Sequence, residues 1–255
     1  MLHIHLILCT HYHLPVELRK LVIHDYLSIS LTNETIRNAV EIDHLLSSLR
    51  YGPIEHWDTS AITNMTGLFV NIYSFNADIS NWDISNVTNM SFMFFNAFSF
   101  NQPIGKWNVG RVTDMSCMFY NAKSFNQSLE KWNVGNVSNM KMMFHTAQTF
   151  NQPINIWNIS KVIDLSFMFY EALSFHQPLH EWNVSSVITT RCMFYRASAF
   201  NFPLGTWNVS NVKDMGFMFY EAQSFQQSLE LWNVSNVHNL GFMFYGAKQF
   251  NAPLG

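Results

Sequence analysis

The tract WNVSNVKDMGFMFYEAQSFQQSL, Trp207–Leu229, decides the fold, because close variants of it recur along most of the chain. All eight tryptophans lie 25 residues apart: Trp57, Trp82, Trp107, Trp132, Trp157, Trp182, Trp207 and Trp232. One phenylalanine series keeps the same spacing from Phe69 to Phe244, and another from Phe75 to Phe250. A fixed period of this length is typical of a solenoid, in which each unit buries its apolar side chains against its neighbours.

Inside one unit, the apolar spacing predicts a short helix. Apolar residues recur at intervals of three and four: Val112, Met115, Met118, Phe119 and Ala122. Serines stand before this face as N-caps would: Ser85, Ser160, Ser185, Ser210 and Ser235. Aspartates fall in the first turn, where the helix dipole favours negative charge: Asp114, Asp164 and Asp214. Each unit is therefore predicted to contain a helix of about three turns.

The stretch before this helix predicts a short strand. In Ile104–Val109 the alternation would turn Trp107 and Val109 toward the core and Asn108 toward solvent. Stacking would place such strands in a parallel sheet, about 4.8 Å apart. The predicted fold is an α/β repeat solenoid of leucine-rich-repeat-like coils, each a short parallel strand plus a short helix. Residues 51–255 would form about eight 25-residue repeats, and residues 1–50 a helical N-terminal cap.

Three further series of positions have structural interpretations. A small residue repeats where the helix would approach its neighbour closely: Ala97, Ala122, Ala147, Ala172, Ala197, Ala222 and Ala247. Asparagines that follow the second phenylalanine would satisfy backbone groups of the next coil: Asn76, Asn101, Asn126, Asn151, Asn201 and Asn251. Cys117 and Cys192 lie three units apart, or about 14 Å, beyond the roughly 7 Å that a disulfide can bridge. We therefore expect free thiols.

Composition excludes several classes of protein. The 255 residues are 48% hydrophobic and only 12% charged, whereas disordered chains have the opposite balance. A net charge of −3 offers no basic surface for nucleic acid. No run approaches 18 apolar residues, so no transmembrane segment is expected. The N-terminus lacks Lys and Arg before Arg19, which does not fit a signal peptide and favours an intracellular location.

Catalytic and metal-binding patterns are also missing from the sequence. No phosphate-binding or hydrolase motif occurs, so we expect neither enzymatic activity nor a cofactor. Histidines cluster near the N-terminus, at His3, His5, His11 and His13, but no cluster of cysteines or carboxylates joins them at ligand spacing. We therefore interpret them as an alternating leader rather than a metal site.

The repeat resembles the DUF285 repeat, the 25-residue class of BspA-like leucine-rich-repeat proteins. The resemblance runs from Tyr51 to Gly255, and the segment Glu34–Trp57 is similar to the helical N-terminal cap of such arrays. It implies a non-enzymatic solenoid used in surface or binding roles, in a family found on bacterial surfaces and in large DNA viruses and protists. A bacterial surface protein would need a signal or lipid attachment site, and this sequence shows neither.

A second resemblance lies upstream, where LPVELRKLVIHDYL (Leu14–Leu27) looks like the opening of an F-box. The residues that fit are Leu14, Pro15, Leu18, Leu21, Val22 and Leu27. It implies a substrate adaptor of a ubiquitin ligase, with this segment as the adaptor-binding helix. The alternative is an amphipathic capping helix over the first coil.

The favoured function is a non-enzymatic scaffold for protein–protein contact, or for contact with a surface or a carbohydrate. Its predicted interaction face is the outward asparagine of each strand: Asn108, Asn133, Asn158, Asn183, Asn208 and Asn233. The alternatives are the F-box-like adaptor and a surface adhesin or virion surface protein. Ten glycosylation sequons, including the last four of these asparagines, bear on the surface alternative.

The C-terminal coil predicts self-association. No polar capping segment follows the last repeat, and solenoids usually need one for solubility. We therefore expect end-to-end association through that coil. The sequence does not identify the protein partner.

Overall fold

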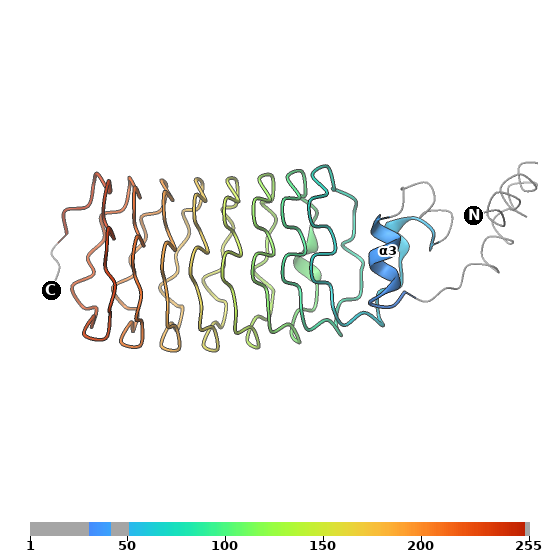
Figure 1. Ribbon diagram of the computed structural model, residues 1–255, viewed down its shortest axis with the longest axis horizontal. Coiled ribbons are helices and arrows are strands. Elements are labelled where there is room, and N and C mark those ends of the chain that lie inside the picture. The colour runs from blue at the N-terminus through green and yellow to red at the C-terminus, as the bar shows by residue number, and fades with distance from the viewer. Residues whose placement is uncertain (1–30, 42–50, 253–255) are drawn as a thin grey trace, which may run out of the picture.

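The computed structural model describes residues 31–41 and 51–252. Figure 1 shows coils stacked side by side in a row, from helix α3 (Thr35–Glu41) at one end to the C-terminal coil at the other. Isolated β-bridges join the same position of successive coils, all parallel, from Asn64↔Asn89 to Asp214↔Asn239. The predicted repeat solenoid is therefore confirmed.

The interior consists of aromatic side chains stacked from coil to coil. The ring centroids of Phe94 and Phe119 are 5.5 Å apart, and those of Trp132 and Trp157 are 6.4 Å apart. Each indole N–H also finds an acceptor: Trp157 Nε1 donates to the carbonyl of Leu129, 3.1 Å away. Aromatic pairs contribute about 0.5–1.5 kcal/mol each beyond the area they bury. A core built this way stabilises the array at every contact between coils.

The predicted helix of each unit is wrong, because this segment forms a chain of tight turns. In the coil that starts at Val112, the N–H groups of Met118 and Tyr120 bond three residues back, to Met115 and Cys117. The intervening N–H groups leave the coil: that of Phe119 donates to Met143 in the next coil, at 2.9 Å. An α-helix would keep all of these donors within one coil, so stacking and helix formation compete for the same groups.

Backbone conformation shows how these turns follow one another. Cys117 and Asn121 have φ values of 55° and 57°, in the left-handed region that the third residue of a type II turn requires. The same two positions of the following coils are also left-handed, at Met142 and Thr146 with φ of 56° and 52°. The apolar residues at intervals of three and four therefore reach the core from chained turns.

The predicted strand is also wrong in its position. Ile104–Lys106 forms the 3-10 helix η2, and the residues that the structure describes contain no β-strand longer than an isolated bridge. The alternation itself is as predicted, since Trp107 and Val109 are buried and Asn108 is exposed. Gly105 permits the tight approach of η2 to the next coil, because a Cβ there would lie 2.4 Å from the Ser128 carbonyl oxygen.

The N-terminal end is covered by α3, which buries Ile36 and Ala39. Thr32 and Thr35 cap this helix reciprocally, each backbone N–H donating to the other's hydroxyl oxygen. Next to it, Asn33 Oδ1 accepts from the backbone N–H groups of Thr63 and Asn64 in the first coil. A second short 3-10 helix, η1 (Ile54–His56), precedes Trp57. The F-box-like segment, Cys9 and the N-terminal histidines lie outside the described residues.

Two of the predicted structural series are found as expected. The alanines from Ala97 to Ala222 are fully buried, although they belong to turns and not to a helix. The asparagine series bonds from coil to coil, as where Asn101 Oδ1 accepts the backbone N–H of Asn126 at 2.9 Å. Cys117 and Cys192 are free and buried.

Candidate interaction surface

The six asparagines predicted as the interaction face lie in one column along the solenoid, and each is exposed. Their side-chain oxygens are nevertheless in use, because each accepts the backbone N–H two residues further on. Asn158 Oδ1 accepts from Ser160 at 3.1 Å, and Asn108 Oδ1 from Gly110 at 3.2 Å. These are Asx turns, which hold the backbone where it bends. The asparagine column thus has a structural role in the repeat.

Aspartates occupy the same column in the first two coils and make the same turn. Asp83 Oδ1 accepts the backbone N–H of Ser85 at 2.9 Å, and this bond lowers the pKa of the carboxyl group. The pKa of Asp58 is also lowered, chiefly by the hydroxyl and then by the backbone N–H of Ser60. An ionised carboxylate and an amide oxygen therefore serve equally well as acceptors in this column.

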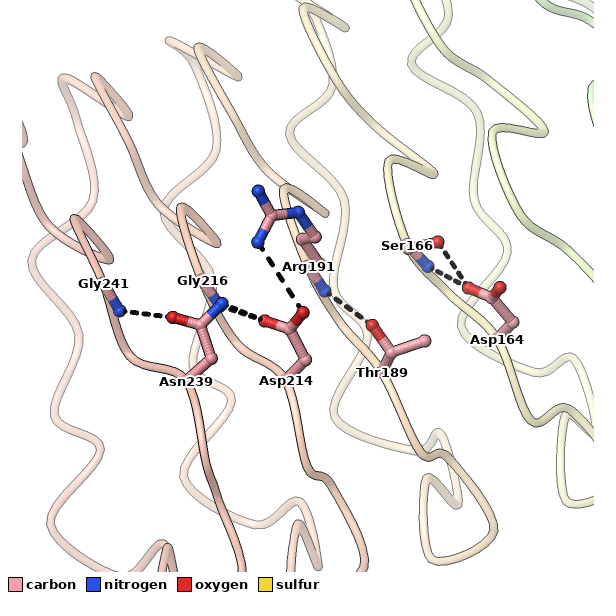
Figure 2. Close-up of polar contacts among 8 residues, drawn as sticks. All are labelled: Asp164, Ser166, Thr189, Arg191, Asp214, Gly216, Asn239 and Gly241. Carbon is pink, nitrogen blue, oxygen red and sulfur yellow. Dashed lines mark hydrogen bonds and ion pairs between the residues drawn. The ribbon is translucent and has the colours of Figure 1, made fainter.

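A second Asx column contains the aspartates that the sequence had suggested for a helix N-terminus (Figure 2). Asp164 Oδ1 accepts the N–H of Ser166 at 2.7 Å, and Asp214 Oδ1 accepts that of Gly216 at 2.9 Å. A helix N-cap makes the same contact to an N–H two or three residues ahead. That likeness explains why these residues indicated a helix start.

A different stretch of each coil presents an aromatic surface, which we call the aromatic face. Its outer row is Phe95, Tyr120, His145, Tyr170, Tyr195, Tyr220 and Tyr245. The inner row beside it is Phe92, Cys117, Met142, Phe167, Cys192, Phe217 and Phe242, of which the two cysteines are buried and only the four phenylalanines are aromatic. Outer-row rings are partly exposed and stack on one another, with centroids 4.4 Å apart for Tyr170 and Tyr195. The flat sides of the rings thus cover each other along the axis, and the ring edges face outward.

Two groups of ion pairs border the aromatic face. In one, Arg191 lies 3.6 Å from Asp214 and 5.1 Å from the centroid of the Phe217 ring. The other is a cluster around Arg196. Arg196 Nε lies 2.7 Å from a Glu221 carboxylate oxygen, and its Nη1 lies 3.2 Å from Glu171. The two carboxylates raise the pKa of the guanidinium group, so it is charged at every accessible pH. In the equivalent positions of earlier coils stand uncharged residues, Asn96, Asn121 and Thr146. The charged end of the face is therefore confined to its C-terminal half.

His145 interrupts the tyrosines of the outer row. Its ring stacks on Tyr120 and Tyr170 with centroid distances of 4.3 and 4.4 Å, and its Nδ1 is 3.0 Å from Thr146 Oγ1. Burial in this stack lowers the pKa of the imidazole to about 4. Burial likewise raises the pKa of the Cys117 and Cys192 thiols to about 11, which leaves them protonated and poorly nucleophilic.

Metal ligands and a surface depression are the other features that bear on chemistry. Within residues 31–41 and 51–252, no group of three or more His, Cys, Asp or Glu side chains could hold a metal ion. A shallow depression of about 230 Å³ lies between η2 and the next coil, bordered by Lys106, Ser128, Glu130 and Lys131. None of the helices in the described ranges is long and apolar enough to cross a membrane.

Sequence reasoning missed the aromatic face, although the signal was present. Its residues fall in the segment interpreted as a helix, whose apolar face was assigned to Met118 and Phe119 and not to the Tyr120 that follows. Chained turns, unlike a helix, place neighbouring residues on opposite sides of the backbone: Phe169 is fully buried while Tyr170 is partly exposed. The repeated Phe-Tyr pair could have shown that two columns, and not one, were aromatic.

The sequence matches the family described as "Mycoplasma protein of unknown function, DUF285" over residues 41–156, 107–203 and 148–255. Among solved structures, it is similar to an internalin from Listeria monocytogenes, with 10% identity and a TM-score of 0.26. The alignment covers 90% of this chain and 82% of the internalin, and the TM-score is too low to support a detailed likeness. No curated protein matches the chain.

Proposed function

The chain belongs to the DUF285 family, and from that premise we propose that it is a non-enzymatic repeat scaffold that binds a protein partner through the aromatic face. The supporting observation is the partly exposed ring ladder, which continues through seven coils from Phe95 to Tyr245. Tyrosine and phenylalanine are enriched at protein interfaces because one ring buries much area at little entropic cost. In contrast, the oxygens of the predicted asparagine column are already bonded.

The geometry favours protein over carbohydrate as the partner. A sugar ring stacks on the flat side of an aromatic ring, but here the flat sides cover each other from coil to coil. The interplanar angle of Tyr195 and Tyr220 is 1°, with centroids 4.6 Å apart. What the face offers instead is a row of ring edges, five of which belong to tyrosines. Such edges combine apolar contact with a hydroxyl group, which suits the side chains of a protein.

A binding comparison tests this proposal. The full chain and its Tyr195→Ala variant would be immobilised, and the proteins retained from extracts of source cells would be quantified. The control is Leu231→Ala, because Leu231 is outside both rows of the face and, at 81%, is the most exposed large apolar side chain among the described residues. We expect at least one protein to be lost with Tyr195→Ala and retained with Leu231→Ala. Equal retention of every protein by both variants would contradict a role of the aromatic face.

The adaptor and surface alternatives need separate tests, since neither the F-box-like helix nor the location is described by the structure. For the adaptor, deletion of residues 1–30 should abolish binding of a ubiquitin-ligase component while the solenoid stays folded. We further propose an intracellular location. A glycosidase gel-shift on protein from a eukaryotic source would argue for the secretory route instead, because Asn158, Asn183, Asn208 and Asn233 are exposed sequons.

End-to-end self-association is a second proposal, supported by the last described coil. There Leu240 is 45% exposed, although its counterparts in inner coils, such as Met215 and Leu165, are fully buried. A Leu240→Lys substitution should weaken such association in light scattering. A wild-type protein that stays monomeric at high concentration would refute it.

A further inference from the structure

The aromatic face has one property that few partners share, a repeat along its length. Its outer-row rings recur at intervals of 4.3–5.0 Å between centroids. An extended peptide laid along the solenoid would not keep step with these rows, since its same-side residues repeat about every 6.6–6.8 Å. A second copy of this chain repeats at the same interval by construction, as the paired sheets of steric zippers do.

We propose that the aromatic face pairs side by side with the aromatic face of a second copy, with the two solenoids antiparallel. This inference rests on the proposed function and names the partner. Most dimers are two-fold symmetric. If one residue of the first copy contacts another residue of the second copy, the same pair therefore meets again with the two copies exchanged. A two-fold axis across the solenoids keeps each column opposite itself and reverses the order of the coils.

Exposed aliphatic side chains place that axis. The column that begins with Thr63, four residues before the inner row in the sequence of each coil, holds Thr or Ser in its first four coils and Lys or His in its last two. Only between them does it hold isoleucine, at Ile163 and Ile188, which are 52% and 43% exposed. An axis midway between these two coils lays Ile163 of one copy against Ile188 of the other. The contact between Ile163 and Ile188 would thus occur twice in the dimer, and all four exposed isoleucines would be buried.

Charge points to the same axis independently. With the axis between these coils, Glu171 of one copy faces Arg196 of the other, and Glu221 faces the uncharged Thr146. An axis through the coil of Arg196 would instead set the two arginines against each other and Glu171 against Glu221. In this register the outer row of one copy also lies against the outer row of the other, with Tyr170 opposite Tyr195.

The size of the contact sets the expected affinity. This register overlaps about six coils, or ~29 Å of solenoid. Such a narrow contact lies at the lower end of specific interfaces, which bury about 800 Å² per partner. We therefore expect a dimer with a dissociation constant in the range of about 1–100 μM.

Sedimentation velocity of the full chain from about 2 to about 200 μM, which spans this range, tests the proposal. Ile188→Lys should weaken the dimer at least tenfold, because it sets a charge against Ile163 of the second copy. It should fold, since Lys213 occupies the equivalent position of the next coil. The matched control is Leu231→Lys, at a column where Lys106 and Lys131 occur naturally. A monomer throughout, equal effects of both variants, or loss only in Leu240→Lys would overturn it.

Cross-linking tests the orientation. In the Cys9→Ser background, Thr146→Cys combined with Glu221→Cys should give a disulfide-linked dimer on oxidation, because these positions face each other across the axis. Within one chain they lie three coils, about 14 Å, apart and cannot bond. Asn121→Cys combined with Glu221→Cys is the control of wrong register, and linkage as efficient as in the first pair would overturn the antiparallel arrangement.

This experiment separates the inference from the proposed function. If the chain is monomeric but Tyr195→Ala still loses a captured protein, the face binds another protein and only the inference fails. If the chain dimerises as expected while no other protein is captured, the second copy is the partner.

Discussion

The aromatic face and the asparagine column are both exposed ladders that run the length of the solenoid, yet they differ in what their side chains already do. Each asparagine oxygen accepts a backbone N–H of its own coil, as between Asn183 and Ser185 at 3.1 Å. The aromatic rings mainly stack on one another, and the other contacts of the face are made by Arg196, which lies over the Tyr195 ring, and by Thr146, whose Oγ1 is 3.0 Å from His145 Nδ1. Regular exposure alone therefore does not mark a binding surface; the better criterion is whether the polar groups of an exposed column are already bonded within the coil.

The largest expected effect concerns His145, the only outer-row residue with a titratable ring near neutral pH. Its folded pKa of about 4 lies below the ordinary 6.5, so the unfolded chain binds more protons between these values. The free energy of unfolding should be highest above pH 6.5 and decrease as the pH falls toward 4, by roughly 2–3 kcal/mol. Urea titrations followed by tryptophan fluorescence at pH 7 and 4.5 would measure it.

His145→Tyr is the matched variant, because tyrosine occupies this column in the coils on either side, at Tyr120 and Tyr170. It should abolish the part of the acid sensitivity that lies between pH 6.5 and 4.5. An unchanged pH profile in His145→Tyr would show that another group is responsible.

The next expected effect compares the two ladders directly. Tyr170→Ala removes a ring stacked on both sides, against His145 and Tyr195, and should lower the free energy of unfolding by about 2 kcal/mol. Asn158→Ala removes one exposed hydrogen bond and should cost about 0.5–1 kcal/mol. Urea denaturation of both variants at pH 7 would rank them. A larger cost for Asn158→Ala would reverse the importance assigned to the two ladders.

The sequence predicted the solenoid because a strict 25-residue period has few physical solutions. A unit with tryptophan and two phenylalanines cannot bury them alone, so the stacking and the core residues followed from the period. The asparagine that bonds to the next coil was also predictable, since turn asparagines commonly accept backbone N–H groups. These inferences depend on which residue types repeat and not on the path of the backbone.

The local backbone could not be predicted in the same way. Chained turns and a helix both bring residues three and four apart to one side, as with Met115, Met118 and Phe119. Left-handed turns would normally be indicated by glycine, but here Cys117, Phe167 and Phe217 adopt them. The inter-coil hydrogen bonds that hold these residues exist only after stacking. For the same reason, the aromatic face was not visible from one repeat.

A smaller effect is expected beside the aromatic face, at Thr146. This β-branched residue has φ of 52°, a conformation that costs a side chain of this type about 1–2 kcal/mol. Thr146→Gly should therefore raise the free energy of unfolding by about 1 kcal/mol, as measured by urea denaturation. Thr149→Gly is the control, since Thr149 is not left-handed and glycine there should destabilise. Stabilisation by both exchanges would contradict a backbone origin.

The smallest expected effect tests the asparagine column as a purely structural feature. Asn158→Asp keeps an oxygen acceptor for the N–H of Ser160, so at pH 7 the free energy of unfolding should change by less than about 0.5 kcal/mol. The new carboxylate should behave as Asp83 does, whose pKa is lowered by the N–H of Ser85. Because the folded pKa would lie below the unfolded one, its contribution should be present above about pH 4 and lost below it.

Urea denaturation at pH 7 and pH 3 would measure both parts of this prediction, with Asn158→Ala as the variant that has no acceptor at all. Neutral neighbours in the column, Asn133 and Asn183, ensure that the added charge meets no like charge in adjacent coils. If Asn158→Asp costs as much as Asn158→Ala at pH 7, the amide N–H₂ group matters in its own right. The asparagine column would then have a role that its Asx turns do not explain, and it would again be a candidate interaction face.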